Sequence, residues 1–320
     1  SAAAIVEAIA ETTAAIAARI ARGPLDGALA AKVGGNADGD TQTTLDVWSN
    51  SQMVQAVRTA GAASVLSEEL DSPLTLDPYG AIGVAIDPLD GSSNIDTNVS
   101  IGTIFSLLPA DGDATYAQAG SAQIAAGYVI YGPQCAMVLT LGHGTDIFTL
   151  DPDTREFYLT TPKVTISRAS SEYAINASNY RHWSEAIRAY IDDCLAGTEG
   201  PRGANVNMRW IASLVAECHR ILARGGVFLY PGDERKGYRK GRLRLLYEAN
   251  PIAMLVEQAG GKAIDGFTRI LDIVPDAPHQ RTPLIFGSAG EIDRIAIYKA
   301  DPSAMFERSP LFGRRGLLRV

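Results

Sequence analysis

The most constraining feature of the sequence is an acidic turn between two strongly apolar runs. "AIGVAI" ends at residue 86, "DPLDGSSNID" occupies residues 87–96, and "VSIGTIFSLL" begins at residue 99. An ordinary turn explains most of this composition, because Asp, Pro, Gly, Ser and Asn are common turn residues. It does not explain why Asp87 and Asp90 both lie at the end of one apolar strand. Two carboxylates held close together repel unless a cation or a proton intervenes. The runs predict two strands with a candidate cation site between them.

Composition and charge describe a globular, acidic chain. The 320 residues are 46% hydrophobic and 20% charged, and the net charge is −8. Such a chain is a poor candidate for nucleic-acid binding, and no apolar run approaches the roughly 20 residues of a membrane span. The three cysteines, Cys135, Cys194 and Cys218, have no metal-ligand spacing, and their odd number argues against a disulfide framework. We therefore expect a reducing, cytoplasmic compartment, no nucleic-acid partner and no membrane partner.

Strand and helix patterns alternate irregularly along the chain. Isoleucines at positions 5, 9, 16 and 20 fit one face of an N-terminal amphipathic helix. A Gly-rich loop is expected over residues 24–44, and strands over residues 125–150. Further helices are expected over residues 183–196 and 208–224, and from Asn250 as a cap. Without regular βαβ alternation, the pattern predicts a layered α/β (α+β) fold, with two lobes that meet near residues 160–175.

Carboxylates gather at four points: Asp40 with Asp46, Glu68 with Glu69, Asp87 with Asp90, and Glu248. Taken singly, Asp46 fits a helix cap, the glutamate pair a solvated strand end, and Glu248 a surface charge. Taken together, they offer the oxygen ligands that Mg²⁺ prefers beside substrate phosphates. Serines and backbone amides of "GSS" would donate to a phosphate if they open a helix or a nest. The sequence thus indicates metal-assisted phosphoryl transfer.

Four motifs in this order resemble class I fructose-1,6-bisphosphatase. They are "SEE" at 67–69, "DPLDGSSNID" at 87–96, "GTIFSL" at 102–107 and "GRLRLLYEANP" at 241–251. The resemblance covers most of the chain and implies a layered αβαβα sandwich of the sugar phosphatase type. It also implies an N-terminal domain over residues 1–165 with the catalytic loops, and a C-terminal sugar-phosphate-binding domain over residues 166–320. The implied reaction releases the 1-phosphate of fructose 1,6-bisphosphate, in gluconeogenesis or the Calvin cycle.

The resemblance implies a role for each residue near the cleaved phosphate. Glu69, supported by Asp46, would help to activate the attacking water, and Asp40 would lie in a loop that closes over the metals. Two or three Mg²⁺ ions per subunit, or Mn²⁺ in their place, would be held by Glu68, Asp87, the Leu89 carbonyl, Asp90 and Glu248. The 1-phosphate would be bound by Gly91, Ser92, Ser93 and Arg244.

A second set would hold the phosphate that is retained: Asn176, Tyr180, Arg209, Tyr230 and Arg242. Arg242 and Arg244 would otherwise be a basic helix surface, but their place just before Glu248 favours phosphate binding. Arg242 stands where the family usually has lysine, so a planar fork replaces a point charge. Trp210 stands where tyrosine is common, so a phosphate-facing hydroxyl is lost. "NASNY" is one residue longer than the commonest form before its tyrosine, Tyr180.

The resemblance also bears on assembly and regulation. Family tetramers contribute the residue matching Arg209 from a neighbouring subunit, so we expect a homotetramer. AMP-inhibited members carry Lys-Tyr and Arg where this chain has Ala81, Ile82 and Pro109; weak or no AMP inhibition is expected in this degenerate region. Two alternatives stay open: a sedoheptulose-1,7-bisphosphatase or bifunctional sugar bisphosphatase, and a non-catalytic sugar-phosphate sensor.

Overall fold

The computed structural model describes residues 1–35 and 41–300. The helices within these ranges are α1 (Ala2–Arg22), α2 (Thr44–Thr59), α3 (Glu185–Ala196), α4 (Leu214–Arg224), α5 (Asn250–Gln258) and α6 (Ala289–Ala300). The strands of the first half are β1 (Lys32–Gly35), β2 (Thr41–Thr43), β3 (Ser64–Ser67), β4 (Leu74–Thr75), β5 (Ile82–Asp90), β6 (Ile101–Pro109), β7 (Ala125–Tyr131), β8 (Cys135–Thr140), β9 (Thr145–Leu150) and β10 (Phe157–Thr161). Those of the second half are β11 (Glu172–Ile175), β12 (Asn207–Met208), β13 (Val227–Tyr230), β14 (Leu243–Arg244), β15 (Lys262–Ile264), β16 (Arg281–Thr282) and β17 (Leu284–Gly287).

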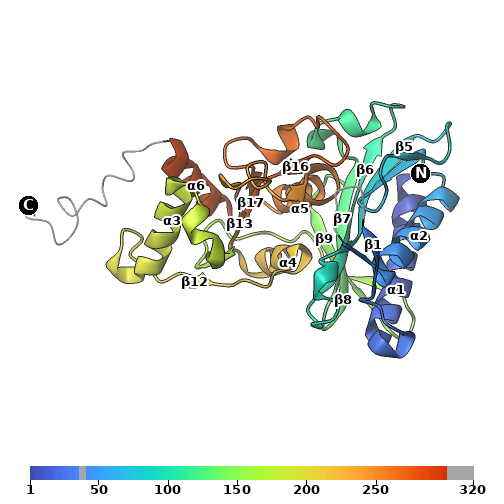
Figure 1. Ribbon diagram of the computed structural model, residues 1–320, viewed down its shortest axis with the longest axis horizontal. Helices are drawn as coiled ribbons and strands as arrows, with labels where there is room; N and C mark the ends of the chain where they lie inside the picture. Colours follow the sequence, from blue (N-terminus) through green and yellow to red (C-terminus); the bar gives the residue numbers. More distant parts are fainter. Residues whose placement is uncertain (36–40, 301–320) are drawn as a thin grey trace, which may run out of the picture.

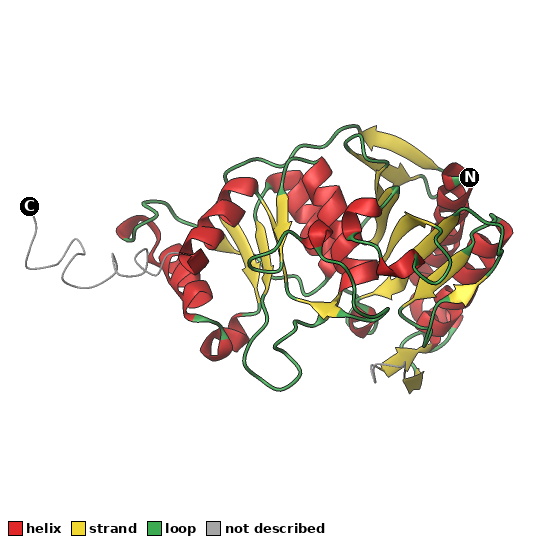
Figure 2. Ribbon diagram, turned by 90° about the horizontal axis from the view of Figure 1, so that it is seen from above, coloured by secondary structure: helices red, strands yellow, loops and turns green. Residues whose placement is uncertain are grey.

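Five layers of helices and sheets alternate along the molecule (Figure 1). Helices α1 and α2 cover the outer face of an eight-stranded sheet of order β10-β9-β8-β7-β6-β5-β3-β4. Helices α4 and α5 lie between this sheet and a five-stranded sheet of order β12-β11-β13-β17-β15. Helices α3 and α6 cover the outer face of the second sheet, and Figure 2 shows the same alternation from above. The predicted α/β fold and its αβαβα layering are confirmed.

Burial explains why the middle layers read as apolar runs. Every residue of β5 is buried, as are residues 101–108 of β6, because helices cover both faces of the sheet. Helix α5 is buried from Asn250 to Val256, as expected for a helix enclosed between two sheets. No helix of the described residues is both long and apolar enough to span a membrane.

Three expectations about local structure need correction. Residues 208–213 are not helical, because α4 begins only at Leu214 behind its Ser213 cap. Asn250 is not a cap, because a π-helix over Leu245–Ala249 runs directly into α5. The region 24–44 is not wholly a loop, since β1 and β2 within it pair in antiparallel fashion. The N-terminal helix is confirmed as α1.

Candidate active site

A cluster of three buried carboxylates lies between the two sheets. Asp87 and Asp90 come from the end of β5, and Glu248 comes from the π-helix before α5. One carboxylate oxygen from each residue lies within 4.8 Å of the others, and all three side chains are buried. The structure therefore brings together three of the four acidic residues, Asp87, Asp90 and Glu248, for which a metal was predicted; Glu68 is the fourth.

An irregularity in β5 places both aspartates at this cluster. Asp87 pairs with Ile104 and Asp90 with Gly102, so two residues of β5 face the single residue Thr103 of β6. Such bulges re-aim side chains at the end of a strand. The Thr103 hydroxyl donates to the Pro88 carbonyl at 2.9 Å, and the Leu89 N–H donates to Asp87 Oδ1 at 2.9 Å. These bonds hold the acidic turn in one conformation.

The π-helix positions Glu248 opposite the aspartates. Wide helical turns of this kind occur often at functional sites. Glu248 Oε2 accepts the backbone N–H of Arg244 at 2.5 Å, and Asp90 Oδ2 accepts the Val215 N–H at 3.2 Å, at the start of α4. The cluster is thus tied to β14 and α4 of the second lobe.

Burial and mutual repulsion favour the protonated forms of these carboxyl groups. Burial raises the pKa of Asp87 well above its usual range, and the charges of Glu68, Asp90 and Glu248 raise it further. The pKa of Glu248 is raised in the same way, and burial raises that of Asp90 to about 6. A divalent cation among these oxygens would remove the repulsion. The donor set therefore fits a hard metal ion.

The turn after Asp90 presents small residues and backbone amides. Gly91 has φ 77°, a left-handed conformation that favours glycine, and Ser92–Asn94 form one 3₁₀ turn. Asp46 faces this turn from α2, where it also closes a capping box with Thr43. Burial raises the pKa of Asp46, whereas hydrogen bonds from Thr43 and Ser92 lower it. Asp46 is therefore the N3 partner of the N-cap residue Thr43, and it also lies beside the predicted phosphate-binding turn at Ser92.

Arg244, Glu68 and Glu69 complete this side of the site. The Arg244 side chain is only 6% exposed, and its guanidinium lies 3.7 Å from Glu68 Oε1. Glu69 Oε2 accepts a hydrogen bond of 2.5 Å from Gln42 Nε2. The sequence did not single out Gln42, because an exposed-looking loop glutamine carries no signal of its own. Asp40 lies outside the described residues.

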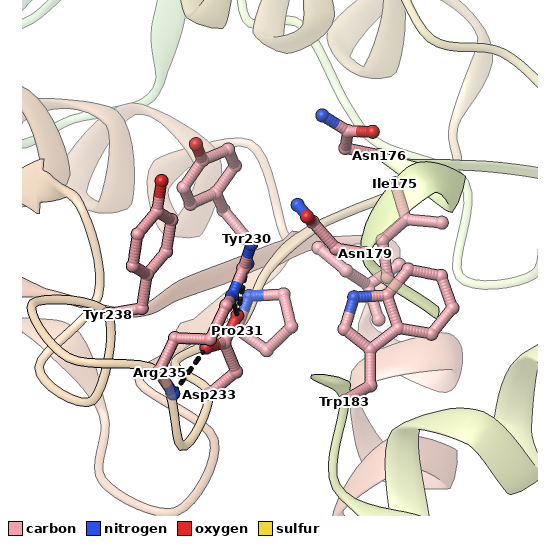
Figure 3. Close-up of a pocket in the computed structure, with 10 residues that line it drawn as sticks. Ile175, Asn176, Asn179, Trp183, Tyr230, Pro231, Asp233, Arg235 and Tyr238 are labelled. Carbon is pink, nitrogen blue, oxygen red and sulfur yellow. Dashed lines mark hydrogen bonds and ion pairs between the residues drawn. The ribbon is translucent and has the colours of Figure 1, made fainter. Parts of the chain in front are cut away.

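A separate pocket in the second lobe contains part of the predicted far-phosphate set (Figure 3). Asn176 and Tyr230 line it. Arg242 is not a lining residue, but its guanidinium carbon lies 5.1 Å from the ring centroid of Tyr238, which is one. Tyr180 and Arg209 are not among its lining residues: the Tyr180 hydroxyl donates to Asp192 at 2.8 Å, and Arg209 lies 3.5 Å from Glu172. Asn179, Trp183, Asp233, Arg235 and Tyr238 line the pocket without having been predicted.

Similarity to solved structures defines the class of protein. The fold matches the crystal structure of Leishmania major fructose-1,6-bisphosphatase in holo form with a TM-score of 0.86 and 38% sequence identity. The match covers 92% of this chain and 93% of that one. The T-state structure of the same enzyme matches with a TM-score of 0.82. Fold and buried carboxylate cluster together define a sugar-phosphate phosphatase.

Sequence comparisons then give the family. Residues 2–162 match the family described as "Fructose-1-6-bisphosphatase, N-terminal domain", and residues 166–300 match the corresponding C-terminal domain. A class 1 fructose-1,6-bisphosphatase of Paracoccus denitrificans is 56% identical over 98% of this chain and 94% of its own length. One of Azorhizobium caulinodans is 57% identical over 92% of this chain and 93% of its own length. The chain belongs to the class 1 fructose-1,6-bisphosphatase family, a metal-dependent family of phosphatases.

Proposed function

We propose that the protein hydrolyses the 1-phosphate of fructose 1,6-bisphosphate to give fructose 6-phosphate and phosphate. The buried cluster of Asp87, Asp90 and Glu248 carries this proposal, because three close carboxylates without a cation would destabilise the fold. Family membership supports the same substrate, and no observation favours a different sugar. The retained cluster also argues against a non-catalytic sensor.

The proposed metal ligands are Glu68, Asp87, the Leu89 carbonyl, Asp90 and Glu248. Bound Mg²⁺ or Mn²⁺, in two or three sites, would lower the pKa of water and neutralise charge on the cleaved phosphate. The chain itself would bind that phosphate through Gly91, Ser92 and Ser93, with Arg244 as the buried cation. Glu69, oriented by Gln42, would accept the proton of the attacking water. Asp46 would support it from beside Ser92, and Asp40 is proposed from sequence alone.

The phosphate that is retained would be held by Asn176, Tyr230 and Arg242 in the second lobe. Fixed protein donors suit this task, because the retained group has to be oriented rather than activated. Tyr180 and Arg209 remain proposed members of this set, although their side chains bond to Asp192 and Glu172 in the single subunit.

Assembly and organisation follow from the same proposal. We propose a homotetramer in which Arg209 serves a neighbouring subunit. Support comes from its exposed side chain, which lies away from the pocket of its own subunit. We also propose domains at residues 1–165 and 166–320, since the two family matches meet between residues 162 and 166. The free cysteines 135, 194 and 218 suit a cytoplasmic compartment.

The test is phosphate release from fructose 1,6-bisphosphate under Mg²⁺ and under excess EDTA. Turnover should require the metal, and Asp90→Asn should reduce kcat at least about a thousandfold. Asp96→Asn is the matched control, because Asp96 is an exposed carboxylate of the same turn. Near-normal kcat in the Asp90 variant would refute the metal assignment. Sedoheptulose 1,7-bisphosphate, assayed in parallel, tests the alternative substrate.

A further inference from the structure

Two of the aromatic positions expected at the far phosphate do not offer a hydroxyl to the pocket. Trp210 replaces a tyrosine, and its ring stacks against Phe228 and Tyr230 with centroids 5.9 and 6.4 Å apart. The Tyr180 hydroxyl donates to Asp192 on α3. A phosphate dianion needs several hydrogen-bond donors. We therefore expect a further donor at this pocket, one that the sequence did not indicate.

Tyr238 occupies the place where such a donor would stand. It comes from the loop between β13 and β14 and lines the same pocket as Asn176 and Tyr230. In Figure 3 the hydroxyls of Tyr230 and Tyr238 point in the same direction. Among the described residues, no side chain or backbone group hydrogen-bonds either hydroxyl. Both phenols therefore keep a donor for a ligand.

The Tyr238 ring also contacts two arginines, of which one forms an ion pair with a carboxylate in the described part of the chain and the other does not. The guanidinium carbons of Arg235 and Arg242 lie 4.0 and 5.1 Å from its centroid. Arg235 is neutralised by Asp233, whose oxygens accept its N–H groups at 2.5 to 3.1 Å. No carboxylate of the described residues forms an ion pair with Arg242. The ring thus holds an uncompensated planar cation at the pocket, a contact that suits arginine better than lysine.

The loop around Tyr238 is built to keep this geometry. The Tyr238 carbonyl accepts the N–H groups of Asp233 and Gly241 at 3.2 and 2.9 Å, and its own N–H donates to the Arg235 carbonyl at 3.0 Å. Gly241 has φ 75°, and a Cβ there would lie 2.3 Å from the backbone of Thr282. Because these hydrogen bonds already order the loop, Tyr238 would lose little conformational entropy when a ligand binds.

We propose that Tyr238 is a further substrate-binding residue for the retained phosphate. Its hydroxyl donates to a phosphate oxygen, and its ring holds Arg242 in position to pair with the same group. The inference rests on the proposed function, because it assigns a ligand within that same site. It explains how the pocket compensates for the hydroxyl lost at Trp210.

The decisive variant is Tyr238→Phe, which removes the hydroxyl and keeps the ring under Arg242. KM for fructose 1,6-bisphosphate and the inhibition constant of fructose 6-phosphate should both rise about tenfold, the loss of one hydrogen bond to a charged group. The kcat should change less than twofold, since the contact exists before and during the reaction. For fructose 1-phosphate, which lacks the far phosphate, kcat/KM should stay unchanged.

Two further variants complete the design. Tyr238→Ala also removes the ring, so both constants should rise further, by about threefold or more. Tyr79→Phe removes a hydroxyl that is 95% exposed and should change nothing. Failure of the wild type to hydrolyse fructose 1,6-bisphosphate would refute the proposed function. Normal hydrolysis with unchanged constants in Tyr238→Phe would overturn this inference alone, as would an equal loss with fructose 1-phosphate.

Discussion

At the scale of single residues, the site combines groups that are costly for folding. Asp87, Asp90 and Glu248 share one buried space, so the fold without a cation must either protonate them or tolerate their repulsion. A group whose pKa is raised in the folded state stabilises below its unfolded pKa, and this stabilisation is lost as pH rises through the folded pKa. The cost of the cluster should therefore be visible as pH-dependent stability.

We predict that the metal-free protein loses stability as pH rises from about 4 to above 6. For Asp90, a pKa raised from 3.8 to about 6 corresponds to about 3 kcal/mol. The Tm in EDTA should fall between pH 5 and pH 7.5, and saturating Mg²⁺ should raise Tm more at pH 7.5 than at pH 5.

Asp90→Asn provides the comparison for this titration. The variant should show a higher Tm in EDTA at pH 7.5 and a weaker pH dependence, because one buried carboxyl no longer ionises. Buried His219, whose pKa is lowered, acts in the opposite direction, but both proteins contain it. An equal pH dependence of Tm in the two proteins would show that the cluster is not the cause.

A second residue-level prediction concerns Gln42. Its amide donates to Glu69 Oε2 at 2.5 Å, so Gln42→Ala should release the predicted proton acceptor from its orientation. We expect kcat to fall about tenfold with KM nearly constant, a loss typical of one positioning contact. Gln55→Ala, on the exposed face of α2, should leave kcat unchanged. A rise in KM without loss of kcat would instead place Gln42 in substrate binding.

The sequence indicated individual site residues where they form a pattern that is rare outside functional sites. The acidic turn revealed Asp87 and Asp90 because buried carboxylates at a strand end are unusual. Tyr238 and Gln42 were missed because tyrosine in a polar loop and glutamine in a Gly-rich segment are common, and only tertiary contacts give them a partner. Tyr180 was expected at the pocket, but its hydroxyl donates to Asp192. The sequence pattern does not indicate this hydrogen bond between residues that are distant along the chain.

At the scale of elements, the start of α4 links the two lobes. We expected this helix from residue 208, but residues 209–213 are not helical and Ala212 has the left-handed φ of 61°. The Ala212 carbonyl accepts a 2.9 Å hydrogen bond from Asn94 of the phosphate turn, and the Val215 N–H donates to Asp90. These long-range partners override local helix preference, and no sequence window contains them.

We predict that this link supports metal binding. Asn94→Ala removes the bond to Ala212 and should loosen the turn that carries Asp90. The Mg²⁺ concentration for half-maximal activity should rise several-fold, the effect expected when a group that orients a metal ligand is lost. Magnesium titrations of steady-state turnover measure this concentration. Asn207→Ala, an exposed asparagine of β12, is the control, and an unchanged magnesium requirement in Asn94→Ala would contradict the link.

At the scale of the whole molecule, the two sheets share one core. Tyr128 and Val138 of the eight-stranded sheet and Phe228 and Phe286 of the five-stranded sheet belong to one cluster, with Leu255 of α5 also in it. The layered arrangement was predictable because apolar strands covered on both faces need helices between sheets. The pairing order of the strands was not, since many registers satisfy the same apolar pattern.

The shared core predicts that both lobes unfold together. Trp48 reports on the first lobe, and Trp183 reports on the second. Two variants, in which Trp48 alone or Trp183 alone is kept and the other two of the three tryptophans are replaced, should show the same denaturation midpoint by fluorescence and by circular dichroism. Leu255→Ala, at a fully buried position, should lower the unfolding free energy reported by both probes by about 2–5 kcal/mol. Leu195→Ala, 68% exposed on α3, should cost less than about 0.5 kcal/mol.

If Trp48 and Trp183 reported separate midpoints, the halves at residues 1–165 and 166–320 would be independent folding units. The helices between the sheets would then be a docking interface and not a common core.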